Sequence, residues 1–199
     1  AVIDLRRFGG HYKTSKIMAE QAASQFAAEG LPVVIVNPTI VLGAGDRRPT
    51  PTGSMIVHYI NGRMKAYLDM SQNVVDVEDV AEGHVLALEQ GRPGQRYVLG
   101  GDNLSMAEVL GHLAEITGIA APRITLPRRL LLALGWVDEW LARHVVPHEP
   151  LFPVEASYHA RDSRELSSDK ARSELGYAPR PARAVLTRAV HWFVSQGFC

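Results

Sequence analysis

Tyr12 and Lys16 are the two residues whose types and spacing are best suited to chemistry. They lie four positions apart in the stretch HYKTSK, and a helix brings side chains at that spacing onto one face, with about 5 to 6 Å between their Cβ atoms. A neighbouring ammonium group stabilises the ionised form of a phenol, so such a pair can move a proton at neutral pH. The alternative is an exposed helix that carries a tyrosine and a lysine by coincidence, and the pattern alone favours that alternative.

The elements around the pair indicate an α/β fold. Residues 12–29 are helix formers, and Gly30 stands where such a helix would end. The continuous apolar run 31–38, LPVVIVNP, is typical of a central strand that is covered on both faces. Residues 41–53 are rich in glycine, proline and threonine and predict a long loop at the carboxyl end of that strand. Ligands bind at this edge in open α/β sheets.

The alternation of strands and helices continues to Gly118. Ser105 and Glu108 have the spacing of a capping box, which predicts a helix beginning after Ser105. Beyond Gly118 the sequence changes to helical pieces punctuated by prolines, which suggests a smaller lobe packed on the sheet. The other predicted elements are helices at 54–62 and 78–90 and strands at 66–70, 73–77 and 95–101.

The composition favours a small-molecule partner. Lysine plus arginine equals aspartate plus glutamate at 21 each, so the overall charge gives no case for nucleic acid or an anionic membrane. The single cysteine, Cys199, cannot form an intrachain disulfide, and we expect a cytoplasmic protein. The longest apolar run, 130–137, is far shorter than the roughly 20 residues that a membrane-spanning helix needs, so we expect no integral membrane segment.

Several segments, in this order, resemble one enzyme family. HYKTSK is followed by LPVVIVNPTIVLGAG, then NVVDVEDVAEGHVLAL, then QRYVLGGDNLSMAEVL. This series is similar to the extended short-chain dehydrogenase/reductases, the NAD-dependent epimerase/dehydratase group, from about residue 11 to about residue 118. Within that group it looks most like the dihydroflavonol-reductase-like branch, and the loop with PTPTG is especially similar to hopanoid-associated sugar epimerases.

The resemblance implies a fold and a reaction. Residues 1–100 would be the C-terminal part of a Rossmann-type parallel sheet, and residues 101–199 a smaller mixed substrate-binding lobe to which 46–69 contribute. The intact enzyme would use NAD or NADP for hydride transfer at a carbinol or ketone carbon. A sugar nucleotide and a flavonoid-like or steroid-like ketone remain alternatives as substrate, and a homodimer is left open.

The resemblance also assigns roles to individual residues. Tyr12 would be the catalytic acid/base, and Lys16 would favour its ionised form and bind the nicotinamide ribose. The loop that lies against the nicotinamide in relatives matches Pro38, Thr39, Ile40 and Val41, for which a plain strand-to-loop turn is the alternative. Four residues of the following loop would face the substrate by position alone: Asp46, Arg48, Thr50 and Thr52.

The sequence departs from the family pattern in two ways. Gly43-Ala44-Gly45 has Arg48 where the third glycine of a G-x-G-x-x-G phosphate loop would stand. Residues 1–11 contain no serine or threonine to hold the substrate oxygen. We therefore expect the chain to be the C-terminal portion of an enzyme and to be inactive alone.

Two further patterns have structural explanations that we favour. Asp76 and Asp79 precede His84, but an aspartate at a helix start satisfies free backbone donors, so we expect no metal site. Trp136 and Trp140 lie in an Arg/Trp-rich helix that we assign to core packing, with binding to a membrane surface or a partner as the alternative. A further alternative for the whole chain is a noncatalytic nucleotide-binding or scaffold module of the same fold.

Overall fold

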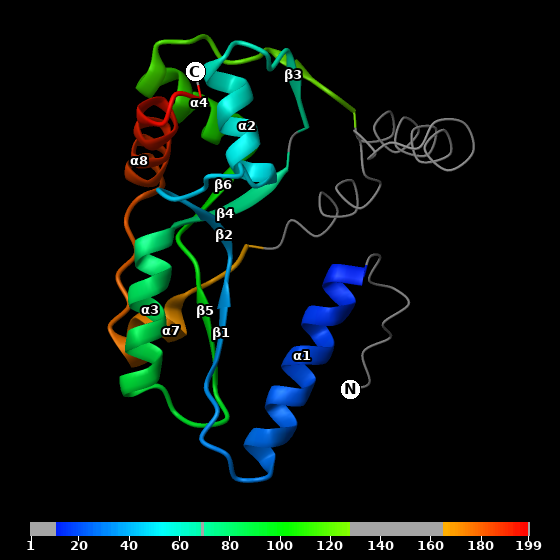
Figure 1. The fold of residues 1–199 in the computed structure, drawn as a ribbon, viewed down its shortest axis with the longest axis vertical. Coiled ribbons are helices and arrows are strands. Elements are labelled where there is room, and N and C mark those ends of the chain that lie inside the picture. The colour runs from blue at the N-terminus through cyan, green and yellow to red at the C-terminus, as the bar shows by residue number, and fades with distance from the viewer. Residues whose placement is uncertain (1–10, 69, 128–164, 199) are drawn as a thin grey trace, which may run out of the picture.

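The computed structural model describes residues 11–68, 70–127 and 165–198 (Figure 1). The Arg/Trp-rich segment that we interpreted as a core helix lies outside these residues. In chain order the elements are α1 (His11–Ala28), β1 (Ile35–Pro38), β2 (Ile40–Leu42), α2 (Pro51–Ile60), β3 (Ala66–Tyr67), β4 (Ser71–Asp76), α3 (Val77–Gln90), β5 (Arg96–Leu99), β6 (Asp102–Ser105), α4 (Met106–Thr117), β7 (Ile124–Thr125), α7 (Asp169–Leu175) and α8 (Ala182–Ser195).

Parallel strand pairing confirms the predicted α/β class. β1 pairs in parallel with β5, with Ile35 opposite Arg96, and β2 pairs in parallel with β4, with Ile40 opposite Val74. β3 and β7 form a third, short parallel pair. β6 runs antiparallel to β4, so the small sheet of β2, β4 and β6 is mixed.

The buried central strand is β4 rather than the run at residues 31–38. β4 is buried from Gln72 to Asp76, as a strand covered on both faces must be. The predicted strand 31–38 shortens to β1, whose residues are half-buried and whose Pro38 is exposed. In the described part of the chain β1 has one hydrogen-bonded neighbour, β5, so its apolar side chains are only partly covered.

Local signals set the end of α1 and the start of α4 as the sequence predicts, whereas the helix predicted at 54–62 is α2 and runs from Pro51 to Ile60. α1 ends at Ala28, and Gly30 follows with a φ of 99°, a conformation that glycine adopts without a steric penalty. Ser105 and Glu108 form the expected capping box: the Ser105 hydroxyl accepts the Glu108 N–H, and the Glu108 carboxylate accepts the Ser105 N–H. These ends fix where the strands before and after each helix can run.

Two apolar cores pack helices against the strands. The upper core in Figure 1 joins α2, α4 and α8 against β2 and β4, and it includes the buried Phe193 of α8. The lower core joins α3 and α7 to the β1–β5 pair around Tyr97 and Leu99. Among the side chains of α1 that the structure describes, none belongs to either core cluster.

The two cores bear on the predicted division at residue 100. α2, which lies within residues 46–69, packs with α4 and α8 in the upper core. α7, which comes after residue 100, packs on α3 and β5 in the lower core. The division into two lobes stays a prediction, and the second part of the chain returns to cover the first.

A buried tyrosine ties α7 to β5. The Tyr97 side chain is fully buried, its hydroxyl donates to Glu174 Oε2 at 2.8 Å, and it accepts the Arg92 N–H at 3.2 Å. The hydrogen bond that the Arg92 guanidinium donates to Glu174 Oε1, with the one from the Tyr97 hydroxyl, lowers the pKa of Glu174. Glu174 therefore stays charged and keeps its place beside the end of α3.

Removing the Tyr97 hydroxyl should loosen this joint. We expect Tyr97→Phe to lower the free energy of unfolding by about 1 to 2 kcal/mol, because Glu174 and the Arg92 N–H lose a buried partner. Tyr177→Phe is the matched control, since the Tyr177 hydroxyl is buried with no hydrogen-bond partner among the described residues. Urea unfolding of both variants measures the difference, and equal losses would contradict the assigned role of Tyr97.

Candidate functional site

The predicted catalytic pair lies at the start of α1. Tyr12 and Lys16 are one turn apart, and Lys16 Nζ is 5.5 Å from the centre of the Tyr12 ring. Tyr12 is 72% exposed within the described part of the chain. The helix thus brings the two side chains together as the spacing predicts, with the phenol accessible to a ligand.

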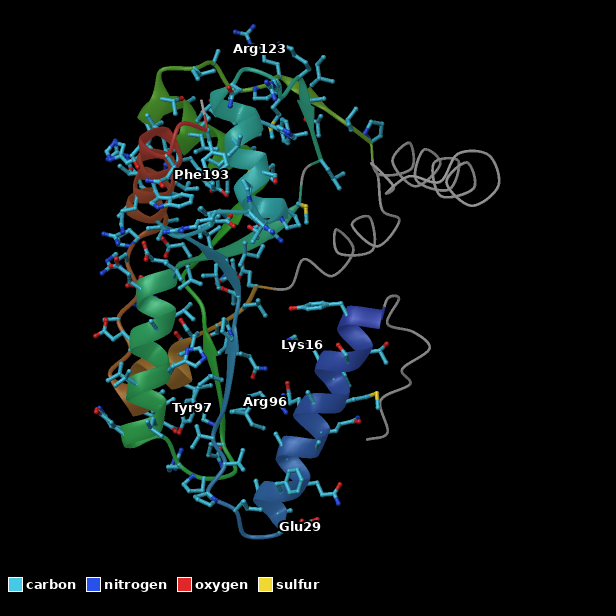
Figure 2. The ribbon with its side chains drawn as sticks, viewed as in Figure 1. Lys16, Glu29, Arg96, Tyr97, Arg123 and Phe193 are labelled. Carbon is cyan, nitrogen blue, oxygen red and sulfur yellow. The ribbon has the colours of Figure 1, made fainter. Side chains whose placement is uncertain are left out.

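Lys16 faces a cavity between α1 and β1. The cavity has a volume of about 370 Å³, and Lys16 and Glu20 line it from α1 while Val36 and Asn37 line it from β1. Figure 2 shows Lys16 on the side of α1 that faces β1. The lysine therefore lies beside the carboxyl half of the strand whose end carries the predicted cofactor loop.

Two buried polar atoms at the end of β1 have no hydrogen-bond partner among the described residues. They are Asn37 Oδ1 and Thr39 Oγ1. Thr39 also approaches Gly100 so closely that a Cβ at residue 100 would lie 3.0 Å from the Thr39 Cγ2 methyl group. A buried polar atom without a partner costs free energy, so this corner suits a ligand that donates hydrogen bonds.

The rest of the predicted cofactor loop joins two strands. Pro38 ends β1, and Thr39 sits between β1 and β2 with its N–H bonded to Leu99 O. Ile40 and Val41 belong to β2, whereas the sequence placed Val41 at the beginning of a loop. The irregular backbone begins only at Gly43, because β2 is held in register against β4.

The structure gives two of the predicted substrate residues a local role. Asp46 accepts hydrogen bonds from the N–H and the hydroxyl of Thr50, and the Thr50 hydroxyl accepts the Gly53 N–H as the N-cap of α2. Thr52 lies in the first turn of α2, and Arg48 is exposed in the loop. Asp46 and Thr50 also line a cavity of about 250 Å³ with Val41, so the loop and the end of β2 share one hollow.

The cap predicts a stability effect at Thr50. We expect Thr50→Ala to lower the free energy of unfolding by about 1 kcal/mol, because the Gly53 N–H loses its acceptor. Thr52→Ala, in the first turn of the same helix, should change it by less than about 0.5 kcal/mol. Thermal or urea unfolding compares the two, and an equal loss in both would show that the cap carries no special weight.

The carboxylates before His84 form an ion-pair network. The N-cap of α3 is Asp76, which accepts the Glu78 N–H, and not Asp79. Asp76 pairs with Arg180 and Arg188, and Asp79 pairs with Arg180. Within residues 11–68, 70–127 and 165–198 no cluster of metal-ligating side chains is present. The structural interpretation of these carboxylates is favoured by their partners.

Three contributors near the site were not singled out from the sequence. Asn37 supplies one of the unpartnered oxygens, and Glu20 binds both Asn37 and Arg96. A signal for Glu20 exists, since it lies four residues after Lys16 and shares its helix face. No sequence signal marks Arg96, because its position depends on how β5 pairs with β1.

The fold and the site together define a class: a Rossmann-type α/β protein with a tyrosine–lysine pair beside the carboxyl end of a parallel strand. Residues 7–100 match the model of the NAD dependent epimerase/dehydratase family. Over that region the chain is similar to this family, in agreement with the resemblance.

Similar proteins carry different names. "Putative dihydroflavonol 4-reductase" of Synechocystis sp. is 38% identical over 193 residues, which are 95% of this chain and 56% of that protein. "Sterol demethylase protein B" of Methylococcus capsulatus is 32% identical over 190 residues, 95% of this chain and 58% of that protein. A solved nucleoside-diphosphate-sugar epimerase from Pseudomonas aeruginosa is 33% identical with a TM-score of 0.80, covering 99% of this chain and 59% of that one.

These relatives are longer than the chain. The chain spans less than two thirds of their length, so the activity of the whole protein is a matter for proposal. The dihydroflavonol-reductase-like branch has a counterpart in the name of one relative, while the likeness to hopanoid-associated epimerases stays a prediction. No helix among the described residues has the length and apolar character needed to cross a bilayer.

Proposed function

We propose that the protein expressed from its complete reading frame catalyses NAD(P)-dependent hydride transfer at a carbinol or ketone carbon. The observation that carries the proposal is the placement of Tyr12 and Lys16 on one helix face, with Lys16 lining a cavity against β1. The family is described as NAD dependent, and reductase and sugar-epimerase relatives support the oxidoreductase class.

The nicotinamide end of the cofactor fits the residues present. A carboxamide donates hydrogen bonds, and Asn37 Oδ1 and Thr39 Oγ1 are buried acceptors that lack donors among the described residues. Lys16 would bind ribose hydroxyls from the α1 side of the same strand. The diphosphate end of the cofactor has no such counterpart in this sequence, because no G-x-G-x-x-G loop occurs in it.

Tyr12 has the task of moving the hydroxyl proton. When bound, the nicotinamide supplies the acceptor or donor of hydride. In the oxidation direction the phenolate oxygen of Tyr12 takes the proton of the substrate hydroxyl as the carbon gives up hydride, and in the reduction direction Tyr12 returns it. Lys16, whose Nζ lies 5.5 Å from the centre of the Tyr12 ring, would assist this transfer from the same helix face. Epimerisation would use the same step twice through a keto intermediate.

The substrate class needs its own test. Relatives are named for a dihydroflavonol, a sterol and a nucleotide sugar. We propose Arg48 and Thr52 as residues that face the substrate, since both lie in the loop and first turn beside the end of β2, and Asp46 and Thr50 as residues that shape that loop. An arginine suits a diphosphate.

A panel experiment tests the function. The complete protein is assayed with NAD and NADP against a nucleotide sugar, a dihydroflavonol and a hydroxysteroid, by the absorbance of the reduced cofactor for net oxidation or reduction and by product analysis for epimerisation. Turnover with one class supports the proposal and names the substrate. Cofactor binding without turnover of any class would favour the alternative, a noncatalytic nucleotide-binding module.

A further inference from the structure

The side chain of Glu20 bridges three elements with one carboxylate. Glu20 Oε2 accepts a hydrogen bond from Asn37 Nδ2 of β1 at 3.0 Å, and Glu20 Oε1 pairs with Arg96 Nη2 of β5 at 2.7 Å. Each oxygen has its own partner, so the contact fixes the direction of the side chain as well as its distance. Figure 2 shows Arg96 in the region between β5 and α1.

Apolar packing does not hold α1 in the same way. Neither core cluster includes a residue of α1, and Met18 and Phe26 are 55% and 53% exposed in the described part of the chain. A cavity lies between α1 and β1, lined by apolar residues of both elements as well as by Lys16 and Glu20. The rotation and lateral position of α1 against the strands therefore depend on specific contacts, and Glu20 makes two of them.

The catalytic pair lies on the same helix face as this anchor. Tyr12, Lys16 and Glu20 succeed one another at four-residue steps, which place them on neighbouring turns of one face. A rotation of α1 that moved Glu20 away from Asn37 and Arg96 would move Lys16 and Tyr12 with it. Glu20 lies four residues after Lys16, a spacing at which the two side chains could pair. Asn37 and Arg96 engage the two oxygens of the Glu20 carboxylate instead.

We propose that Glu20 is a positioning residue, which docks α1 on Asn37 and Arg96 and so directs Tyr12 and Lys16 to the carboxyl end of β1. The proposal rests on the proposed function, because it assigns the orientation of that same pair. In this role Glu20 acts through the helix that carries the pair, because its two carboxylate oxygens are engaged by Asn37 and Arg96.

The test separates position from stability. Glu20 and Arg96 are 29% and 58% exposed, and exposed ion pairs contribute little to stability. We expect Glu20→Ala in the complete protein to leave the unfolding midpoint nearly unchanged and to lower kcat about tenfold or more, because small displacements of catalytic groups have large effects on rate. The rate is expressed per cofactor-binding site, and the sites are counted by titration with NADH. A smaller amount of folded protein is then not mistaken for a lower kcat.

Two further variants sharpen the result. Glu20→Gln keeps an oxygen for Asn37 and loses the charge for Arg96, and we expect it to recover part of kcat with a change in KM below about threefold. Glu29→Ala is the control, because Glu29 is an exposed glutamate just beyond α1 that accepts a hydrogen bond from Gln25 of the same helix. It should match the wild type in kcat and KM.

The outcomes distinguish this proposal from the proposed function. A Glu20→Ala enzyme with wild-type kcat per site, beside an inactive Tyr12→Phe enzyme, overturns the positioning role alone. A Tyr12→Phe enzyme with near-normal turnover overturns the proposed function, and the positioning role falls with it. A fall in kcat for Glu20→Ala that vanishes when the rate is divided by the number of binding sites shows a purely structural contact and also overturns the proposal.

Discussion

Tyr12→Phe should abolish NAD(P)-linked turnover of the complete protein while cofactor affinity stays within a few fold of the wild type. The substitution removes one oxygen atom and keeps the ring beside Lys16 Nζ, which lies 5.5 Å from its centre. A positioned acid or base accounts for about 10² to 10⁴ in rate, so kcat should fall by at least that lower figure. Steady-state kinetics and calorimetric titration with NADH measure the two quantities.

Lys16→Met is the informative companion of this variant. Lys16 has two proposed tasks, to assist proton transfer by Tyr12 and to bind the ribose, so its loss should reduce both turnover and cofactor affinity. Tyr12→Phe removes a hydroxyl from an exposed side chain, so it should not change the fold. Equal unfolding midpoints for Tyr12→Phe, Lys16→Met and the wild type would establish that both variants keep it. Near-normal turnover of Tyr12→Phe would remove the catalytic assignment.

Local sequence signals predicted the helix that carries this pair. Gly30 ends α1 because a positive φ is accessible to glycine, and Ser105 and Glu108 begin α4 because their side chains satisfy backbone donors within one turn. Such signals act over three or four residues. The helix ends that they predict therefore depend little on how the rest of the chain folds.

Long-range partners were beyond the reach of the sequence. In the sequence Glu20 has the pattern of a surface residue. Its partner Arg96 comes from a distant part of the chain and reaches Glu20 because β5 pairs with β1. β6 was missed for the same reason, since Asp102 and Asn103 are poor strand formers whose strand exists because β4 offers an edge. The strand expected at 31–38 is shorter because apolarity predicts burial, whereas hydrogen-bonded pairing decides where a strand begins.

The loop after β2 shows how one residue type fits two roles. Position alone assigned Asp46 and Thr50 to the substrate, but Asp46 binds Thr50 and Thr50 caps α2. A Cβ at Gly53 would lie 2.0 Å from Asp46 Oδ2, so the carboxylate is packed onto the first turn of the helix. An aspartate in a loop is equally suited to capping and to ligand binding, and only its neighbours decide between them.

Asp76→Asn should cause the largest loss of stability among these variants, about 2 to 3 kcal/mol. Asp76 is fully buried, and its oxygens lie 3.3 Å from Arg180 Nη1 and 3.0 Å from Arg188 Nε. Asparagine keeps an oxygen for the Glu78 N–H, so the helix cap survives, while the charge and the oxygen that accepts from Arg188 Nε are lost. Breaking a buried pair costs about 3 to 5 kcal/mol, and we expect less because Arg180 and Arg188 are 36% and 41% exposed.

Glu78→Gln supplies the matched control for Asp76→Asn, since Glu78 pairs with the same two arginines but is 53% exposed. Exposed pairs contribute about 0 to 1 kcal/mol, so its loss should stay below that figure in urea unfolding. Asp76 also raises the pKa of Arg188 by its negative charge, and the ion pair between them joins α8 to the end of β4. If both variants lost the same small amount, the network would be a surface feature, and the joint between the last helix and the sheet would depend on the upper apolar core alone.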